Sequence, residues 1–352
     1  MKVLLLTRFA YLGSSSRYRH YQYLPYLREQ GFEVTVAPLL SDDYIERIYS
    51  AQNASRLYLL VSYWKRVWIL LRARHYDLIW LEKEIFPLLP AWLERWWAQR
   101  HIRYVVDYDD ATFHRYDLHA SKIVRSLLGQ KIDQVMRSAA LVTVGNDYVA
   151  DRARRAGASH VEVIPSVVDL VRYLPNYPPA NEVFTIGWIG SPVTTRHLLE
   201  IQPALRDFCE DGNGRVVAIG AAPIAMRQVP LKVEPWSEST EVDQLSRFDV
   251  GIMPLPDSPW ERGKSGLKLI QYMAVACPVI ASPVGVNNDI VEHGVNGFVA
   301  SDSGDWFKSL KFLKANWETS RKMGAAGREK VERQYSLQTM APKISGLFKN
   351  LI

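Results

Sequence analysis

The stretch that decides the fold is WERGKSGLKLIQYMAVACPVIASPVG, residues 260–285, which follows the apolar run Val250–Leu255. The apolar run predicts a buried strand, apolar residues at helical spacing from Leu267 to Ala274 predict a helix, and residues 278–281 predict the next strand. A strand, loop, helix and strand in this order form the repeating unit of a parallel α/β sheet.

The loop before this predicted helix combines small residues with cations. It contains Arg262, Gly263, Lys264, Ser265 and Gly266. Unpaired backbone N–H groups and the positive end of the helix dipole would converge there with two cationic side chains, so the loop suits an anion, most simply a diphosphate. The alternative is that Ser265 only caps a surface helix and the basic side chains are solvated. A P-loop is excluded, because that motif requires glycine where this chain has Ser258.

Composition indicates a globular protein with anionic partners. The chain has 352 residues, enough for two domains, with 48% hydrophobic and 23% charged residues and a net charge of +6. Two cysteines, Cys209 and Cys277, are too few and too far apart for a disulfide framework or a metal site, which favours a reducing compartment. The apolar start of the chain is too short for a signal peptide and predicts a first strand, Val3–Thr7.

The alternation of strand and helix runs through the chain twice. It begins at Val3–Thr7, stops at a Pro-rich passage, Tyr173–Ala180, and restarts with the strand and turn Phe184–Gly190. The fold class predicted is therefore α/β, with two successive Rossmann-like domains and the Pro-rich passage as their linker.

Residues 13–19, GSSSRYR, follow the first strand. Ligands of a parallel sheet gather at the carboxyl ends of its strands, and small residues let a ligand approach the backbone. Arg17 and Arg19 could then meet the charge of that ligand. A simple surface turn is the alternative for this loop.

A second polar cluster follows the strand that ends at Val106. It consists of Asp107, Asp109, Asp110 and His114. Carboxylates this close cannot all be buried and ionised without partners. Three interpretations stay open: a metal site, a site for polyol binding or base catalysis, and a helix N-cap with solvated neighbours.

Residues 56–74 predict a basic amphipathic helix. Leu57, Val61, Trp64, Trp68 and Leu71 form its apolar face, and Arg56, Lys65, Arg66, Arg72 and Arg74 supply its charge. Such a helix can lie in a membrane interface. The alternative is that the apolar face packs on the sheet and the charges are hydrated.

These motifs together resemble the retaining glycosyltransferases of family 4, which have the GT-B fold. The resemblance covers nearly the whole chain and rests on the order and spacing of the Gly13 loop, VIPSVVD (163–169), GWIG (187–190), residues 266–285 with Asn287, and GVNG (294–297). It implies two Rossmann-like domains facing a central cleft. The two domains are an acceptor-binding domain (1–172) and a nucleotide-sugar-binding domain (173–334). A last helix (335–352) crosses back to the first domain.

Several positions depart from the pattern of that family. The glutamate that binds the donor ribose falls on Gln271, and the glutamate aimed at the donor sugar falls on Gly263, where Glu261 or Lys264 could substitute. The arginine expected after Gly190 is Ser191, so Arg196, Arg262 or Lys264 would supply the cations. The family's histidine falls on Asp109 or Asp110, with His114 nearby.

The resemblance and the loops together give a set of predicted site residues. The predicted catalytic residues are Asp110, His114 and Lys264. The predicted donor-binding residues are Gly13, Ser14, Gly190, Ser191, Arg196, Trp236, Arg262, Lys264, Ser265, Gly266, Leu267 and Gln271. The predicted acceptor-binding residues are Ser15, Ser16, Arg17 and Asp109.

The function implied is transfer of a glycosyl group, with retention of configuration, from a nucleotide-sugar to a glycan, lipid-linked or other acceptor in polysaccharide or glycoconjugate biosynthesis. No metal or other cofactor is expected, and the expected location is cytoplasmic or at the inner face of an anionic membrane. A non-catalytic nucleotide-sugar or glycan-binding protein and a sugar-nucleotide epimerase are the alternatives. Nucleic-acid binding is disfavoured because the basic residues are dispersed.

Overall fold

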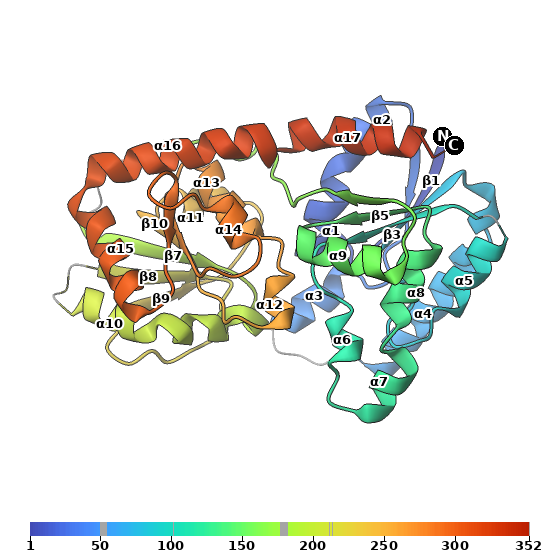
Figure 1. The fold of residues 1–352 in the computed structure, drawn as a ribbon, viewed down its shortest axis with the longest axis horizontal. Helices are drawn as coiled ribbons and strands as arrows, with labels where there is room; N and C mark the ends of the chain where they lie inside the picture. Colours follow the sequence, from blue (N-terminus) through green and yellow to red (C-terminus); the bar gives the residue numbers. More distant parts are fainter. Residues whose placement is uncertain (50–54, 101, 177–181, 211, 213, 352) are drawn as a thin grey trace. The chain divides into compact units, whose positions relative to one another are not determined.

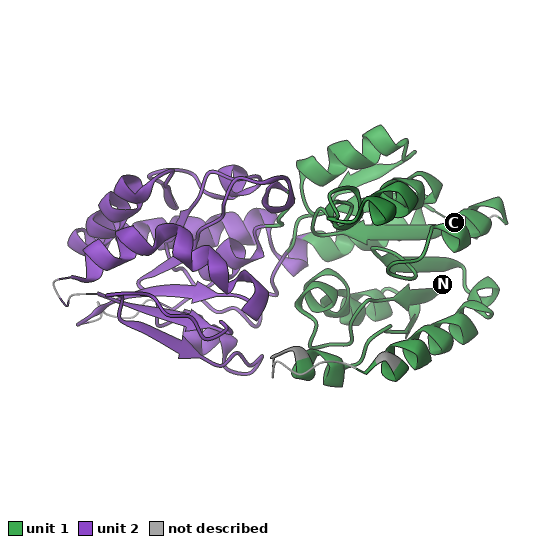
Figure 2. Cartoon of the chain, turned by 90° about the horizontal axis from the view of Figure 1, so that it is seen from below, with its two compact units in different colours: residues 1–166, 263–265, 340–352 green, residues 167–262, 266–339 purple. Residues whose placement is uncertain are grey.

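The computed structural model describes residues 1–49, 55–100, 102–176, 182–210, 212 and 214–351. Their contacts group into two compact units, drawn in two colours in Figure 2. Unit 1 comprises residues 1–166, 263–265 and 340–352, and unit 2 comprises residues 167–262 and 266–339. Residues 167–172 and 335–339, which the sequence analysis gave to the first domain and the final helix, thus group with unit 2. Half of the predicted Pro-rich linker, residues 177–180, lies outside the described residues.

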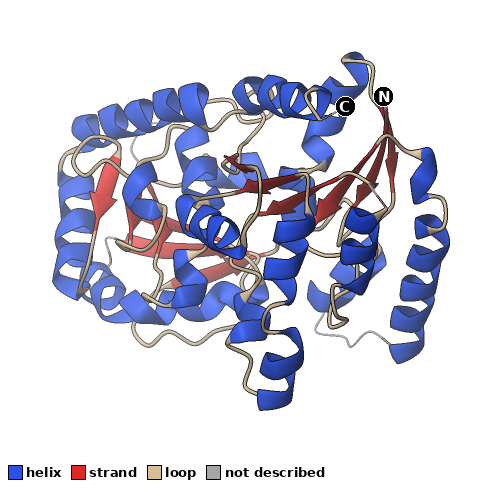
Figure 3. Cartoon of the chain, turned by 45° about the vertical axis from the view of Figure 1, so that its right-hand side comes forward, coloured by secondary structure: helices blue, strands red, loops and turns tan. Residues whose placement is uncertain are grey.

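Unit 1 is built on a six-stranded parallel sheet (Figure 1). Its strands are β1 (Lys2–Leu6), β2 (Glu33–Val36), β3 (Leu78–Glu82), β4 (Tyr104–Tyr108), β5 (Leu141–Val144) and β6 (Val161–Val163). They lie in the order β2-β1-β3-β4-β5-β6, with Val3 opposite Val34 on one side and Leu78 on the other. Strands β3, β4 and β5 are buried along their whole length, because helices cover both faces of the sheet (Figure 3).

Short helices connect these strands. They are α1 (Ser14–Arg19), the 3₁₀ turn η1 (Tyr21–Tyr23), α2 (Leu24–Glu29), α3 (Asp42–Tyr49), α4 (Arg56–Leu70), η2 (Ala73–His75), α5 (Trp92–Gln99), α6 (His114–Asp117), α7 (Lys122–Leu128), α8 (Lys131–Ser138) and α9 (Asp147–Ala156). The prediction that residues 13–19 form a loop is therefore wrong, since residues 14–19 form α1 and Gly13 is its N-cap. Gly13 packs so tightly that a Cβ there would lie 2.3 Å from Cβ of Phe9.

Unit 2 repeats the plan of unit 1. Its parallel strands are β7 (Phe184–Ile189), β8 (Gly214–Ile219), β9 (Leu231–Glu234), β10 (Val250–Met253), β11 (Val279–Ala281) and β12 (Gly297–Val299), in the order β12-β11-β10-β7-β8-β9. Its helices are η3 (Pro192–Ile201), α10 (Gln202–Cys209), α11 (Glu241–Leu245), α12 (Pro259–Arg262), α13 (Leu267–Ala274), α14 (Asn287–Ile290), α15 (Ser303–Ala315) and α16 (Trp317–Gln334). The prediction of two doubly wound α/β domains is confirmed.

The strand order reverses once in each sheet. In unit 1 the reversal lies between β1 and β3, and in unit 2 it lies between β7 and β10. Connections leave the two strands at a reversal in opposite directions, which opens a crevice at their carboxyl ends where ligands of such sheets bind. The topology therefore marks one edge of each unit for function.

The last helix, α17 (Leu337–Lys349), belongs to unit 1 from residue 340 onward. The ring of Phe348 lies 5.1 Å from the Trp80 ring and 6.3 Å from the Phe32 ring, both in edge-on geometry. These contacts confirm the predicted return of the final helix to the first domain. The central cleft between the domains stays a prediction.

Helix α4 departs from one of the two expectations for residues 56–74. Its apolar stripe does not pack on the sheet, since Leu57, Trp64 and Trp68 are 70%, 64% and 58% exposed. One of its supposedly hydrated cations, Arg66, is instead 2% exposed, and burial lowers the pKa of its guanidinium to about 10. Among the described residues, none of the helices combines the length and hydrophobicity that crossing a membrane requires.

Unit 2 depends on a close approach of strand β10 to helix α13. A Cβ on Gly251 would lie 2.3 Å from Cγ of Tyr272, whose ring is fully buried. We expect Gly251→Ala to lower the free energy of unfolding by about 1–3 kcal/mol, because the added methyl overpacks this contact. Urea unfolding measures the change. Gly346→Ala on α17 is the control, since its added Cβ would have no atom within 4 Å apart from its chain neighbours and the backbone of its own helix. Equal stability of the two variants would contradict the packing argument.

Candidate functional site

The N-terminus of α13 lies on the edge of unit 2 that the strand reversal marks. Gly266 is the N-cap, with a left-handed φ of +70°, and no side chain caps the helix. The alternative in which Ser265 caps this helix is therefore wrong. A Cβ on Gly266 would lie 2.2 Å from Cδ1 of Ile290, so glycine is required here for both space and conformation. The first N–H groups of α13, beginning at Leu267, point their partial positive charge toward this edge.

Lys268, which the sequence analysis did not single out, carries a cation to the same place. Its Nζ lies 4.1 Å from the centre of the Trp188 ring, and a Cβ on Gly190 would lie 2.8 Å from it. Gly190 follows β7 directly, so Lys268 connects α13 with the turn at the reversal. The sequence could have indicated Lys268, because it lies in the first turn of a helix whose N-terminus was expected to bind an anion.

Behind this edge, a buried carboxylate organises polar side chains. Glu241 is 1% exposed and accepts hydrogen bonds from the hydroxyl of Tyr173, from Nε1 of Trp236 at 2.6 Å and from Arg172 at 3.3 Å. Gln271 donates through Nε2 to the same Tyr173 hydroxyl at 2.9 Å. The structure thus connects the predicted donor-binding residues Trp236 and Gln271 through Glu241 and Tyr173, neither of which the sequence indicated.

The other predicted donor-side residues of unit 2 have different surroundings. Ser191 caps η3 in a reciprocal capping box with Thr194. Arg196 is exposed on η3, and Arg262 is exposed on α12, where it forms a bidentate pair with Asp257 at 2.6 and 2.8 Å. The contacts described above for Lys268 and Glu241 therefore do not involve Ser191, Arg196 or Arg262.

Glu261, considered as a substitute for the missing family glutamate, is buried in unit 2. One of its oxygens lies 3.7 Å from Nε2 of His197, and Ser258 donates a hydrogen bond to the other. Its carboxylate therefore has partners within its own unit.

The corresponding edge of unit 1 carries a buried charge network. Lys83, just after β3, pairs with Asp109, just after β4, at 2.9 Å and donates to the Ser15 hydroxyl at 3.0 Å. Ser15 in turn donates to Asp109. Burial alone would raise the pKa of Asp109, but the Lys83 charge and these hydrogen bonds outweigh it and hold that pKa well below its usual range.

Neighbouring buried ions complete this network. Arg19 forms a bidentate pair with Asp107 at 2.6 and 2.9 Å and donates to the Ile164 carbonyl, so its charge is satisfied inside the protein. Ser16 donates to Glu82 at 2.6 Å. The predicted acceptor residue Arg17 is also buried, with its guanidinium 4.9 Å from the Tyr18 ring centre. Ser14 is exposed at the start of α1.

Two of the predicted catalytic residues meet in unit 1. Nζ of Lys264 lies 3.2 Å from Oδ2 of Asp110, and both side chains are partly exposed. His114 has separate partners, with Nδ1 2.8 Å from Asp117 and Nε2 2.8 Å from the Tyr148 hydroxyl. His114 therefore has both ring nitrogens occupied by protein groups.

Gly263, which stands where the family has a glutamate, has no room for a side chain. A Cβ there would lie 2.3 Å from Cβ of Ala111 and 2.8 Å from its backbone nitrogen. Asn146 holds the same segment, since its Nδ2 donates to the carbonyls of Gly263 and Lys264 at 2.9 and 3.0 Å. This close packing leaves space only for glycine at position 263.

The contacts narrow the three interpretations of the acidic cluster. Asp107 pairs with Arg19, Asp109 with Lys83 and Asp110 with Lys264, so each carboxylate has a protein cation. In the part of the chain that the structure describes, no three His, Cys, Asp or Glu side chains gather as a metal site. The N-cap interpretation is wrong, because the N-cap of α6 is Phe113 and no side chain caps that helix.

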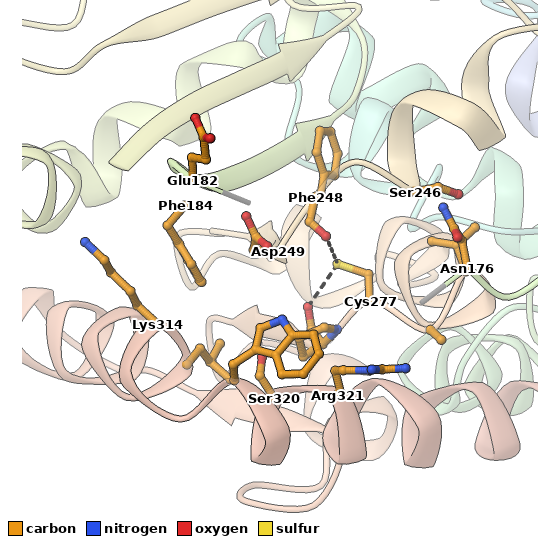
Figure 4. Close-up of a pocket in the computed structure, with 15 residues that line it drawn as sticks. Asn176, Glu182, Phe184, Ser246, Phe248, Asp249, Cys277, Lys314, Ser320 and Arg321 are labelled. Atoms are coloured by element: carbon orange, nitrogen blue, oxygen red, sulfur yellow. Dashed lines mark hydrogen bonds between the residues drawn. The ribbon is translucent and has the colours of Figure 1, made fainter. Parts of the chain in front are cut away.

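A cavity of about 190 Å³ lies elsewhere in unit 2 (Figure 4). Phe184, Asp249 and Cys277 line it, and they stand at the amino ends of β7, β10 and β11. It therefore lies at the opposite edge of the sheet from α13's N-terminus. Cys277 is a free thiol there, and burial raises its pKa far above its usual range.

Comparison with known proteins bears on the family of one part of the chain and on the fold of the whole chain. Residues 183–316 match the family model described as Glycosyl transferases group 1. No curated protein matches the chain in a direct sequence comparison.

Solved structures match over the whole chain. Sucrose-phosphate synthase from Thermosynechococcus elongatus is 17% identical, with a TM-score of 0.74 and coverage of 100% of this chain and 99% of that one. HepE of Anabaena in complex with UDP-glucose is 15% identical, with a TM-score of 0.71 and coverage of 99% and 100%. WaaG, a glycosyltransferase involved in lipopolysaccharide biosynthesis, is 10% identical, with a TM-score of 0.71 and coverage of 99% of both chains. This chain therefore has the GT-B fold that the sequence predicted.

The Lys83–Asp109 pair makes a prediction about stability. Asp109→Asn removes the nearest counter-charge of a buried ammonium and leaves only the more distant Glu82, at 4.0 Å, so it should lower the free energy of unfolding by about 3 kcal/mol at pH 7. Since the pKa of Asp109 is depressed in the folded state, its contribution is present above the unfolded pKa of about 4 and is lost as the pH falls below that value. The difference between variant and wild type should therefore narrow below about pH 4, as urea unfolding across pH measures.

Asp110→Asn is the matched control for this experiment. Its pair with Lys264 is a fifth to a quarter exposed, so its loss should cost about 1 kcal/mol or less. Equal losses in the two variants would show that burial does not distinguish the pairs.

Proposed function

We propose that the protein is a retaining glycosyltransferase that uses a nucleotide-sugar donor. The observation that carries this proposal is the uncapped N-terminus of α13, which lies at the strand reversal of unit 2 with Lys268 against Gly190. The surrounding residues belong to the region that matches Glycosyl transferases group 1.

This edge suits the diphosphate of the donor. When the bond from the sugar C1 to the phosphate oxygen breaks, negative charge grows on the departing nucleoside diphosphate. The N–H groups of Leu267 and the residues after it, with the Lys268 ammonium, stabilise that charge without reorganising. We propose no metal in this role.

The polar side chains behind the edge suit the nucleoside. In the proposed site the Gln271 amide binds a ribose hydroxyl. The Tyr173 hydroxyl orients this amide, because it accepts a hydrogen bond from Gln271 and donates one to Glu241. A buried carboxylate two hydrogen bonds away thus positions a neutral side chain where the resemblance expects a charged one.

The acceptor is assigned to unit 1, where Ser15, Asp109 and Asp110 lie at the carboxyl ends of β1 and β4. We propose that a hydroxyl of a glycan or lipid-linked acceptor bonds to the sugar C1 on the face that the diphosphate leaves and gives its proton to the departing phosphate oxygen, which retains the anomeric configuration. The place proposed is polysaccharide or glycoconjugate assembly in the cytoplasm or at the inner face of the membrane. HepE, whose solved structures contain UDP and UDP-glucose, supports a nucleotide sugar as the ligand class.

A non-catalytic nucleotide-sugar-binding protein is the second candidate. Gly263 and Gln271 favour it, because both replace glutamates of the family that the sequence resembles. The two candidates share a ligand and differ in turnover.

Thermal unfolding with a panel of nucleoside diphosphates and nucleotide sugars tests the binding step. We expect one base to raise the melting temperature by several degrees in the wild type and to lose this effect in Lys268→Ala. Lys122→Ala, at an exposed position of α7, should keep the full shift. No shift with any ligand would contradict the proposal, and binding without hydrolysis or transfer would favour the non-catalytic candidate.

Turnover and stereochemistry test the chemical step. We propose that Lys264, two residues before the N-cap of α13, is a further cation for the departing diphosphate. With the donor that binds, Lys264→Ala should then lower kcat about a hundredfold, because a well-placed group of this kind contributes roughly 3 kcal/mol to the barrier. Proton NMR of the first product formed should show the anomeric configuration of the donor. Wild-type rates in the variant would refute the role of Lys264, and an inverted product would refute retention.

A further inference from the structure

Helix α4 has its apolar side facing solvent. The exposed side chains repeat at three- and four-residue intervals along the helix, which places them on one stripe. They are Leu57, Leu60, Val61, Trp64, Trp68 and Leu71. Trp64 and Trp68 contact each other edge-on, with ring centres 6.4 Å apart, and form the centre of the stripe.

The opposite side of α4 is attached to unit 1 largely by polar groups. Arg66 donates through Nη2 to the carbonyls of Thr7 and Ala37 at 2.6 and 3.0 Å, and Ser62 is also buried. Tyr63 donates its hydroxyl to the Pro87 carbonyl at 2.8 Å. The orientation of the helix is thus set by specific bonds, and the outward apolar stripe is part of the fold.

The segment that leads into α5 extends this apolar surface. The Tyr63 ring stacks on Phe86 at 5.2 Å between centres, which joins α4 to residues 86–89. Leu88, Trp92 and Trp96 beyond it are all exposed. We call the exposed apolar side chains of α4, residues 88–89 and α5 the α4–α5 surface.

The exposed charges within residues 56–74 and along α5 have one sign. Lys65, Arg72 and Arg74 are exposed along α4 and just after it, and residues 56–74 contain no acidic residue. On α5, Arg95 and Arg100 are exposed, whereas the one acidic side chain, Glu94, is buried and accepts from the Ile85 amide.

We propose that the α4–α5 surface docks on an anionic lipid bilayer. Exposed apolar patches of this extent mark interaction sites in proteins. Four exposed tryptophans surrounded by cations fit the chemistry of a bilayer interface, where indole rings settle at the headgroup level and lysine and arginine meet anionic headgroups. Charge complementarity favours lipid over a second copy of this chain, whose matching surface would be equally cationic.

Vesicle flotation tests the proposal with the full chain. Wild-type protein should float with vesicles that contain phosphatidylglycerol and phosphatidylcholine, and binding should fall with added salt and be weak on phosphatidylcholine alone. Trp64→Ser combined with Trp68→Ser should lower the partition coefficient about tenfold or more, and so should Lys65→Glu combined with Arg72→Glu.

Matched variants on α7 of the same unit serve as controls. Ile123→Ser with Leu127→Ser removes similarly exposed apolar side chains, and Lys122→Glu reverses one exposed charge, as each of the two α4 substitutions does. All these positions are exposed, so melting temperatures should stay near that of the wild type.

Three results would overturn the proposal. They are absence of wild-type binding to anionic vesicles, unchanged binding in the Trp64 and Trp68 variant, and a lipid-independent dimer in sedimentation velocity that this variant abolishes. The proposal does not depend on the transfer chemistry above, so failure of one experiment leaves the other standing.

Discussion

Both units depend on one constraint, the parallel pairing of every strand. Strands joined by crossover helices place all their carboxyl ends on one edge of the sheet, and the reversal of strand order opens a crevice at that edge. In unit 2 the crevice brings Gly190 to the start of α13, and in unit 1 it brings α1 to the residues after β3 and β4. The polar side chains of the candidate sites gather where the topology leaves room for a ligand.

The carboxyl edges of the two sheets compensate the desolvation cost of their polar groups in different ways. Unit 1 pairs the buried carboxylates of this edge with cations, as in Arg19 with Asp107 and Lys83 with Asp109. Such pairs add little net stability but are costly to break, so they hold the side chains in one arrangement. In unit 2 the backbone N–H groups at the start of α13 and the Lys268 ammonium place positive charge at the edge, which suits a ligand that brings its own negative charge.

Much of the fold could be predicted from the sequence because it follows from local patterns. Apolar runs and helical spacing located the strands and most of the longer helices, and the restart at Phe184 located the second sheet. The candidate site could be predicted only as a region. Residues 14–19, predicted as part of a loop, form a helix, and the N-cap of α13 is Gly266, whereas the alternative had placed it at Ser265. Tight packing around Gly13 and Gly266 decides the backbone there.

The sequence by itself determined the order of elements. It also determined that Asp109 and Asp110 follow the carboxyl end of a strand in the first sheet, and that the 262–266 loop follows the carboxyl end of a strand in the second sheet. Only the tertiary structure decided which groups are partners, such as Lys268 with Gly190 and Glu241 with Trp236. It also decided that α4 turns Trp64 outward and Arg66 inward. The physical reason is that periodicity defines the faces of a helix, whereas the choice of the face that packs depends on partners distant in sequence, here the carbonyls of Thr7 and Ala37.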